Sequence, residues 1–191
     1  MTSIPQKETL IVDGLSLRPI LISDAPALLK IAEHPVMQSY LRSEGYTDSI
    51  ETFIADYFDP QFATAKHWVI LRGPQPHSEP IGIVDLYPTS PESKPKGMND
   101  AMLSVGVWVH PRLYRQGIAT KSLACVMEQT FQDKPELNWL QASCQITNVA
   151  SRALLEGLDF KFYEAMPFRG QIDVCYLRHR HPTFAHAKIT G

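Results

Sequence analysis

The stretch from residue 107 to residue 120 constrains this chain more than any other part of its sequence. It predicts an apolar strand that passes through a short turn into a helix beginning at or near Gly117. The first N–H groups of such a helix lack intrahelical partners, and with the helix dipole they form a site for an anion. Small residues at Gly117 and Ala119 would let a phosphate approach the main chain. An ordinary strand-to-helix connection has the same pattern, so both interpretations stay open. The nearby cations are Arg112, Arg115 and Lys121.

The spacing in this stretch is not that of the common nucleotide-binding loops, since neither Gly-x-x-x-x-Gly-Lys-Ser/Thr nor Gly-x-Gly-x-x-Gly is present. It resembles the diphosphate-binding motif of the GNAT superfamily of acyl-CoA-dependent N-acetyltransferases, Arg/Gln-x-x-Gly-x-Gly/Ala after a strand that ends in Val-x-Pro. Gly117 and Ala119 occupy the last two defined positions, and Val109-His110-Pro111 supplies the strand end. Tyr114 replaces the first Arg or Gln, a variation familiar in the branch that acetylates ribosomal-protein N-termini.

A second segment, residues 148–160, supports the same resemblance. Its sequence, Asn-Val-Ala-Ser-Arg-Ala-Leu-Leu-Glu-Gly-Leu-Asp-Phe, is similar to the Asn-x-x-Ser-x-x-(Val/Leu)-Leu-Glu-x-Leu-Gly-Phe segment of the ribosomal-protein alanine N-acetyltransferase (RimJ/RimL-like) branch. Asp159 stands where Gly is usual. Three shorter segments resemble that branch too, in the family's order: Leu15-Ser-Leu-Arg-Pro, Ser23-Asp-Ala-Pro-Ala-Leu-Leu and Pro80-Ile-Gly-Ile-Val.

The resemblance implies an α/β (α+β) GNAT fold in one domain, residues 1–191, with splayed central strands. The sheet would be mixed and mostly antiparallel, with about seven strands and about four flanking helices. Gly106 interrupts an apolar strand, which predicts a bulge there or a glycine that avoids a clash. Residue patterns predict strands at 10–19, 66–73, 80–87, 101–110, 137–146, 160–166 and 171–179, and helices at 23–34, 48–58, 115–132 and 147–157.

Composition narrows the classes of function. A net charge of −2 without a basic run argues against a nucleic-acid partner. No apolar run is long enough for a membrane span, and residues 1–9 lack the apolar core of a signal peptide, so a cytoplasmic protein is expected. The three cysteines have no Cys-x-x-Cys spacing and are expected to be free thiols, and no metal site is expected. Monomer and homodimer both remain open.

The resemblance also implies acetyl-CoA as cosubstrate and assigns residues to its binding. Asn148 would bond the pantetheine amide and Ser151 would lie near the sulfur, although Asn148 or Thr147 as a helix cap is the alternative. Many members carry a general-acid Tyr where this chain has Leu155, so Ser151 or a water it holds would take that role. The expected cofactor-binding residues are Val107, Val109, Arg112, Arg115, Gln116, Gly117, Ile118, Ala119, Thr120, Asn148 and Ser151.

The chemistry of acetyl transfer defines what else is needed. A primary amine attacks the thioester directly, so a base helps to deprotonate it and a fixed donor must hold the oxyanion. A backbone N–H beside Val107 is the candidate donor, and Ser151 would reprotonate the leaving thiolate. Ser104 stands where related enzymes often have an acid. The candidate bases are Asp85 and Glu164, followed by Asp100 and His110.

Segment 35–60 would shape the acceptor side, since family members use their first helices there. It contains five carboxylates against one arginine and several aromatic residues, which favours a cationic amine such as a peptide N-terminus or a small cationic amine. A different class also fits the sequence. Because neither the family Tyr nor the strand acid is present, the chain could be a catalytically weak or inactive acyl-CoA-binding regulatory module.

Overall fold

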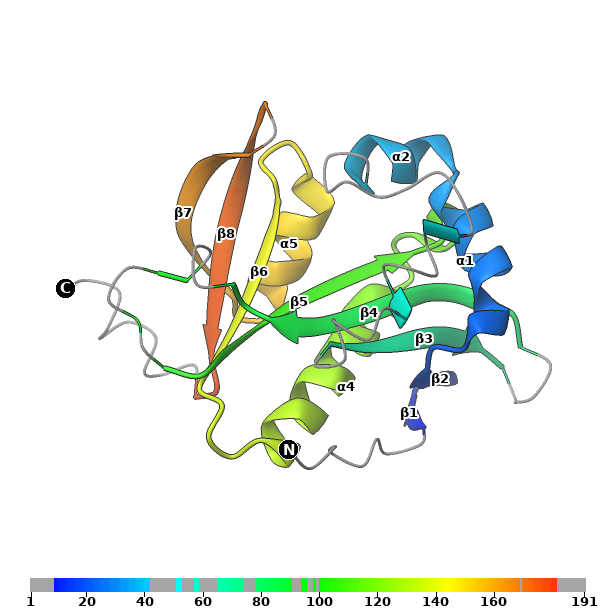
Figure 1. Ribbon diagram of the computed structural model, residues 1–191, viewed down its shortest axis with the longest axis horizontal. Helices are drawn as coiled ribbons and strands as arrows, with labels where there is room; N and C mark the ends of the chain where they lie inside the picture. Colours follow the sequence, from blue (N-terminus) through cyan, green and yellow to red (C-terminus); the bar gives the residue numbers. More distant parts are fainter. Residues whose placement is uncertain are drawn as a thin grey trace. The chain divides into compact units, whose positions relative to one another are not determined.

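The structure of the chain is a computed structural model that describes residues 9–41, 51–52, 57–58, 65–73, 78–90, 94–95, 98, 100–168 and 170–181 (Figure 1). Two short 3-10 turns, Ile22–Asp24 and Pro111–Leu113, precede helices. The elements in chain order are β1 (Leu10–Val12), β2 (Leu15–Pro19), α1 (Ala25–Ala32), α2 (Pro35–Leu41), β3 (Lys66–Arg72), β4 (Pro80–Pro88), β5 (Met102–Val109), α4 (Ile118–Asp133), β6 (Trp139–Gln145), α5 (Val149–Gly157), β7 (Lys161–Phe168) and β8 (Gln171–His179).

The strands form an eight-stranded sheet in the order β1-β2-β3-β4-β5-β6-β8-β7. The described registers are antiparallel except for the parallel pair β5–β6. A mixed, mostly antiparallel sheet with four α-helices in the described residues confirms the expected fold class. The parallel register runs only from Met102–Trp139 to Ser104–Gln141, while β5 continues to Val109 and β6 to Gln145. This short ladder agrees with the expectation of splayed central strands; a bulge at Gly106 stays a prediction.

The extra strand arises at the start of the chain, where a single strand over 10–19 was expected. Asp13 and Gly14 have φ of 45° and 76° and turn the chain back, so Leu10 pairs with Leu17 in an antiparallel hairpin. Asp-Gly is a strong hairpin signal because both central residues of the tight turn need positive φ. The expected single strand was wrong because the apolar alternation on both sides of this dipeptide hides the turn.

The start of α1 also differs from expectation. A helix was expected over 23–34, but the 3-10 turn Ile22–Asp24 precedes α1, and Asp24 stabilises the junction. Its carboxylate accepts the Leu21 N–H at 2.8 Å and both terminal nitrogens of Arg18 at 2.7 and 2.8 Å. Such bidentate, charge-assisted bonds are among the stronger ones in proteins. The helix expected at 48–58 lies largely outside the described residues.

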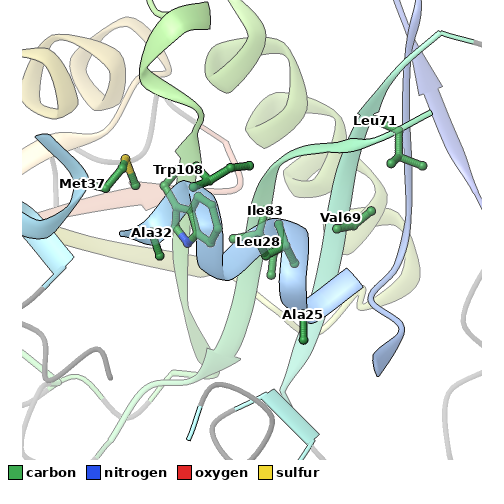
Figure 2. Close-up of a cluster of buried hydrophobic side chains, with 9 residues drawn as sticks. Ala25, Leu28, Ala32, Met37, Val69, Leu71, Ile83 and Trp108 are labelled. Carbon is green, nitrogen blue, oxygen red and sulfur yellow. The ribbon is translucent and has the colours of Figure 1, made fainter. Parts of the chain in front are cut away.

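The chain divides into two compact units, each described by itself. The first comprises residues 1–85 and 107–126, the second residues 86–106 and 127–191. In the first, α1 buries its apolar side against strand residues, with Leu28 and Ile83 fully buried (Figure 2). Burial of such side chains contributes about 1.5–3 kcal/mol each to folding. The cluster comprises Ala25, Leu28, Ile31, Ala32, Met37, Val69, Leu71, Ile83 and Trp108.

The second unit is built on β6, β8 and β7. The β6–β8 register runs without interruption from Trp139–His179 to Gln145–Asp173, and α5 contacts β6 and β7. Trp139 and Leu177 are fully buried together with Met102. The three cysteines are free thiols, as expected: Cys125 of the first unit is half-buried, and Cys144 and Cys175 of the second unit are buried. None of the helices in the described part of the chain is long and apolar enough to cross a bilayer.

Candidate functional site

The turn between β5 and α4 lies in the first unit and has the predicted strand–turn–helix form. The backbone N–H of His110 donates to the Ile81 carbonyl at 2.8 Å, which fixes the end of β5 on β4. The His110 imidazole Nδ1 then accepts the Arg112 N–H at 3.1 Å and caps the short 3-10 turn. Burial, Arg112 and His34 lower the pKa of His110, in that order of importance. His110 therefore shapes the turn, and this bond to Nδ1 explains its polar side chain without a role as base.

Two residues of the turn have left-handed backbone. Arg115 has φ of 62° and Gly117 has φ of 72°. For a residue with a Cβ this conformation costs about 1–2 kcal/mol, so glycine at position 117 avoids that cost. An added Cβ at Gly117 would meet nothing closer than the Lys121 Cε at 3.7 Å. Space at Gly117 is therefore open toward whatever approaches the start of α4, where the Gly117 carbonyl accepts the Lys121 N–H at 2.9 Å.

The exposed residues of the turn carry the positive charge that an anion site needs. Arg112, Arg115, Gln116 and Gly117 are exposed, Ala119 and Thr120 are half-buried, and Ile118 is buried and anchors the first turn of α4. Within the same unit, Val109 is buried and Val107 half-buried at the end of β5. The expected cofactor-binding residues from Arg112 to Thr120 thus lie on one turn and the start of α4, where the first N–H groups of a helix lack intrahelical partners.

Side chains outside the turn tie it to the rest of the first unit. Arg72, the last residue of β3, donates to the Gln116 Oε1 at 2.6 Å. Lys121 pairs with Asp13 at 3.0 Å, and both side chains are well exposed. Gln116 was expected to bind the cofactor; its side-chain oxygen accepts the bond from Arg72, and its amide N–H groups are the donors for any ligand. These contacts surround a hollow of about 320 Å³ beside the turn, lined by Asp13, Gly14, Leu15, Arg72, Gln116, Ile118 and Lys121.

Tyr114, the one departure from the diphosphate motif, has a structural explanation. Its hydroxyl donates to the Met37 Sδ of α2 at 3.2 Å. Burial raises the pKa of Tyr114, with a smaller contribution from Tyr40. The aromatic residue at this position therefore joins the turn to α2, while Arg115 and Gln116 follow directly in the sequence.

Asp85, one of the two first-ranked bases, is paired rather than isolated. Its Oδ1 lies 2.7 Å from the Nδ1 of His67 across β4 and β3, and both side chains are only 13–15% exposed. The ring of Tyr57 packs edge-on against His67 with centroids 4.7 Å apart. Sequence reasoning missed His67. The signal was available, because His67 alternates with Val69 and Leu71 and so stands as a polar residue on an otherwise apolar strand face.

The other expected residues belong to the second unit. Asn148 caps α5, and its Oδ1 accepts the Ser151 N–H at 3.1 Å, so the capping alternative is confirmed. Ser151 is half-buried, and Leu155 on the same face is buried. The cap occupies the Asn148 oxygen and leaves its amide N–H groups as the donors for any ligand. Whether Asn148 and Ser151 contact a cofactor stays a prediction.

The remaining base candidates have local explanations in the second unit. Glu164 is half-buried on β7 opposite Cys175, and burial and then Glu164 raise the pKa of that thiol to about 12. Asp100 accepts the indole N–H of Trp139 at 3.2 Å. Ser104 is buried, and its hydroxyl bonds that of Thr89 at 2.9 Å. Glu164 and Asp100 both stay predictions as candidate bases, and the hydroxyl of Ser104, which stands where related enzymes often have an acid, is bonded to Thr89.

Solved structures that resemble the chain include an acetyltransferase from Salmonella typhimurium that modifies the N-terminal serine of ribosomal protein L7/L12, at 21% identity and a TM-score of 0.69, over 89% of this chain and 97% of the other. RimJ of Mycobacterium smegmatis in complex with CoA-disulfide matches at 18% identity and a TM-score of 0.68, over 87% of this chain and 82% of the other. The aminoglycoside acetyltransferase AAC(6')-Ib in complex with paromomycin and acetyl-CoA matches at 15% identity and a TM-score of 0.74, over 92% of this chain and 99% of the other.

These structural likenesses establish the fold. No curated protein sequence matches the chain significantly. The sequence model of the acetyltransferase (GNAT) domain, however, matches residues 15–161, which include both the turn after β5 and the Asn148 cap. On this match the chain belongs to the GNAT acetyltransferase family.

Proposed function

We propose that this protein binds acetyl-CoA and transfers its acetyl group to the nitrogen of a primary amine. The observation that carries the proposal is the turn after β5, where Gly117 with φ of 72° opens the start of α4 beside exposed Arg112 and Arg115. Those groups suit the diphosphate of a CoA ester, because main-chain donors, a helix dipole and cations converge there. Similar solved structures contain CoA or acetyl-CoA, which supports the same ligand.

In the proposed reaction the amine attacks the thioester carbonyl directly, so no covalent enzyme intermediate is required. A backbone N–H beside Val107 at the end of β5 stabilises the oxyanion, a contribution of typically about 10²–10³ in rate. Asn148 holds the pantetheine arm through its amide N–H groups, and Ser151 returns a proton to the thiolate. Asp85 and Glu164 are the candidate bases. We assign all these roles to one domain, residues 1–191, acting as a monomer or homodimer in the cytoplasm.

The acceptor we propose is a cationic amine, with a peptide N-terminus first and a small cationic amine second. The five carboxylates of segment 35–60 support this choice. Of its aromatic and acidic residues, Tyr40, Glu51, Tyr57 and Phe58 are among the described ones, and the others lie outside the described residues. Structural neighbours that act on a ribosomal-protein N-terminus and bind an aminoglycoside span the same two substrate classes.

A catalytically weak acyl-CoA-binding module is the second candidate function. Leu155 occupies the position of a family general acid, and the Ser104 hydroxyl is already bonded to Thr89. Both candidates require the same turn, so binding of acetyl-CoA cannot separate them. Turnover with an amine can, because only the enzyme consumes the thioester faster with acceptor than without it.

The experiment is a screen of peptides, polyamines and aminoglycosides with acetyl-CoA, reading thiol release and the mass of the acetylated product. The best acceptor is then tested at rising ionic strength. We expect a cationic acceptor whose kcat/KM falls with salt, since screening weakens attraction to the acidic segment. Preference for neutral acceptors without salt dependence contradicts the acceptor class, and binding of acetyl-CoA without turnover on any amine supports the regulatory module.

A further inference from the structure

The face that β3 and β4 turn toward α1 is apolar except for one side-chain pair. Val69 and Leu71 of β3 and Ile83 of β4 are buried in the cluster beneath α1. Side chains alternate along a strand, so His67 and Asp85 belong to this same face, one step beyond Val69 and Ile83. Apolar residues would continue the packing at both positions. These side chains are 13% and 15% exposed, and polar partners in so enclosed a position add little net stability over apolar residues of similar volume, so packing alone does not account for them.

The contact between the two side chains fixes which nitrogen of His67 can accept a proton. An ionised carboxylate only accepts hydrogen bonds, so the 2.7 Å contact to Asp85 Oδ1 requires a proton on Nδ1. In the neutral imidazole the lone pair then lies on Nε2. In the described part of the chain, Asp85 bonds the ring at Nδ1, and the Tyr57 ring packs against its side. This is the arrangement in which a carboxylate orients an imidazole as a general base.

Asp85 lies on β4, the strand that contacts the end of β5, where the oxyanion donor is proposed. Ile81 and Gly82 of β4 lie against His110, Trp108 and Val109, through the hydrogen bond from His110 and through close backbone contact. β4 and β5 run in opposite directions (Figure 1), so the three residues from Gly82 to Asp85 follow β5 back from Trp108 past Val107. Val107 is where the oxyanion donor is proposed, and the strand order β3-β4-β5 puts Asp85 one strand and His67 two strands away from it.

We propose that His67, in place of the candidate bases Asp85 and Glu164, is the general base for acetyl transfer and that Asp85 is its positioning residue. This inference rests on the proposed function. The ammonium of the acceptor gives a proton to Nε2, and the freed lone pair forms the N–C bond as the carbonyl π electrons move to oxygen. Collapse of the intermediate breaks the C–S bond; the nitrogen loses its second proton and the thiolate gains one. The imidazolium finally releases its proton to water, so charge and atoms balance.

The test uses the full chain and amines of graded basicity at one pH, with acetyl-CoA saturating. In His67→Ala we expect kcat/KM to fall by about 10²–10⁴ for an amine whose pKa lies well above the assay pH. The fall shrinks for a weakly basic amine, because that amine is already neutral. Added imidazole restores part of the lost rate. Asp85→Asn keeps the size of the side chain and causes a smaller loss with the same dependence on amine basicity.

Two controls keep the result interpretable. His34→Asn removes another histidine of the same unit while keeping an acceptor for the Val36 N–H, and it leaves the dependence on amine basicity unchanged. Acetyl-CoA affinity by calorimetry and the melting temperature report folding of each variant. An equal loss for all amines, or no rescue by imidazole, overturns the role of His67 while the acetyl transfer stands. A folded wild type that acetylates no amine overturns the proposed function itself.

Discussion

The turn after β5 and the His67–Asp85 pair lie in the same compact unit but are specified in opposite ways. The turn is built from consecutive residues, and its geometry comes from the backbone: positive φ at Arg115 and Gly117, then the start of α4. The pair joins side chains 18 residues apart on two strands. A backbone site tolerates changes of most side chains but not of its glycine, whereas a side-chain site depends on each partner. The two regions should therefore respond differently to substitution.

The largest effect should come from Gly117→Glu. The substitution places a Cβ in left-handed backbone and a negative charge where the diphosphate would bind. We expect acetyl-CoA affinity to fall on the order of 100-fold or more, measured by calorimetry. The affinity for acetyl-CoA should fall much less in Gly117→Asn, because asparagine tolerates positive φ and adds no charge.

Gly157→Glu is the matched control for the turn, since an added Cβ at Gly157 meets nothing within 4 Å. It adds the same charge at the end of α5 and should leave affinity within about twofold, because water and salt screen an exposed charge. Unchanged affinity in a folded Gly117→Glu protein would show that the turn does not hold the cofactor.

The next largest effect should come from Ser151→Ala, which tests a site that depends on a side chain of the second unit, in contrast to the turn, which depends on backbone. If Ser151 returns the proton to the thiolate, kcat should drop about tenfold to a thousandfold. The affinity for acetyl-CoA should stay the same, because the hydroxyl is expected to act on the leaving group rather than on the bound substrate. Steady-state kinetics combined with calorimetry separates the two quantities. A normal kcat would assign the acid to a water or to another group.

Sequence reasoning succeeded where the structure is encoded locally. The strand–turn–helix at 107–120 and the capped helix after Asn148 each depend on residues within a few positions of one another. The fold class followed because several such segments occur in the order of a known family. Strands β3, β4, β5, β6 and β8 were also close to their predicted bounds, since their apolar patterns are long and distinct.

Sequence reasoning failed where distant residues meet. Nothing near His67 in the sequence reveals that Asp85 lies 2.7 Å from its ring, because that contact needs the register of two strands. The same holds for Arg72, which binds Gln116 from 44 residues away, and for Tyr114, which bonds Met37 of α2. The general base was therefore left open among three carboxylates and His110.

Asn148→Asp should weaken acetyl-CoA binding by a smaller factor and leave the stability of α5 unchanged. Aspartate caps a helix as well as asparagine does, so the bond to the Ser151 N–H and the stability of α5 should persist. The substitution removes the amide donors proposed for the pantetheine arm, and a lost hydrogen bond of about 0.5–1.5 kcal/mol corresponds to an affinity about 2- to 12-fold weaker. Asn148→Ala should lose about 1 kcal/mol of stability in addition. Equal affinity of wild type and Asn148→Asp would limit Asn148 to capping.

The smallest effect should be a gain in acetyl-CoA affinity on substitution of Asp13. Its carboxylate pairs with Lys121 at 3.0 Å beside the turn, and both side chains are at least 45% exposed. Exposed pairs contribute at most about 1 kcal/mol, so Asp13→Asn should change the stability little. Removing the negative charge releases Lys121 toward the site, and acetyl-CoA should bind up to about threefold more tightly at low salt, with the gain lost at high salt. Asp133→Asn, at the opposite end of α4, is the control and should have no effect on affinity. Weaker binding in Asp13→Asn would mean that the ion pair positions Lys121 for the phosphate, which would make the turn dependent on side chains as the His67–Asp85 pair is.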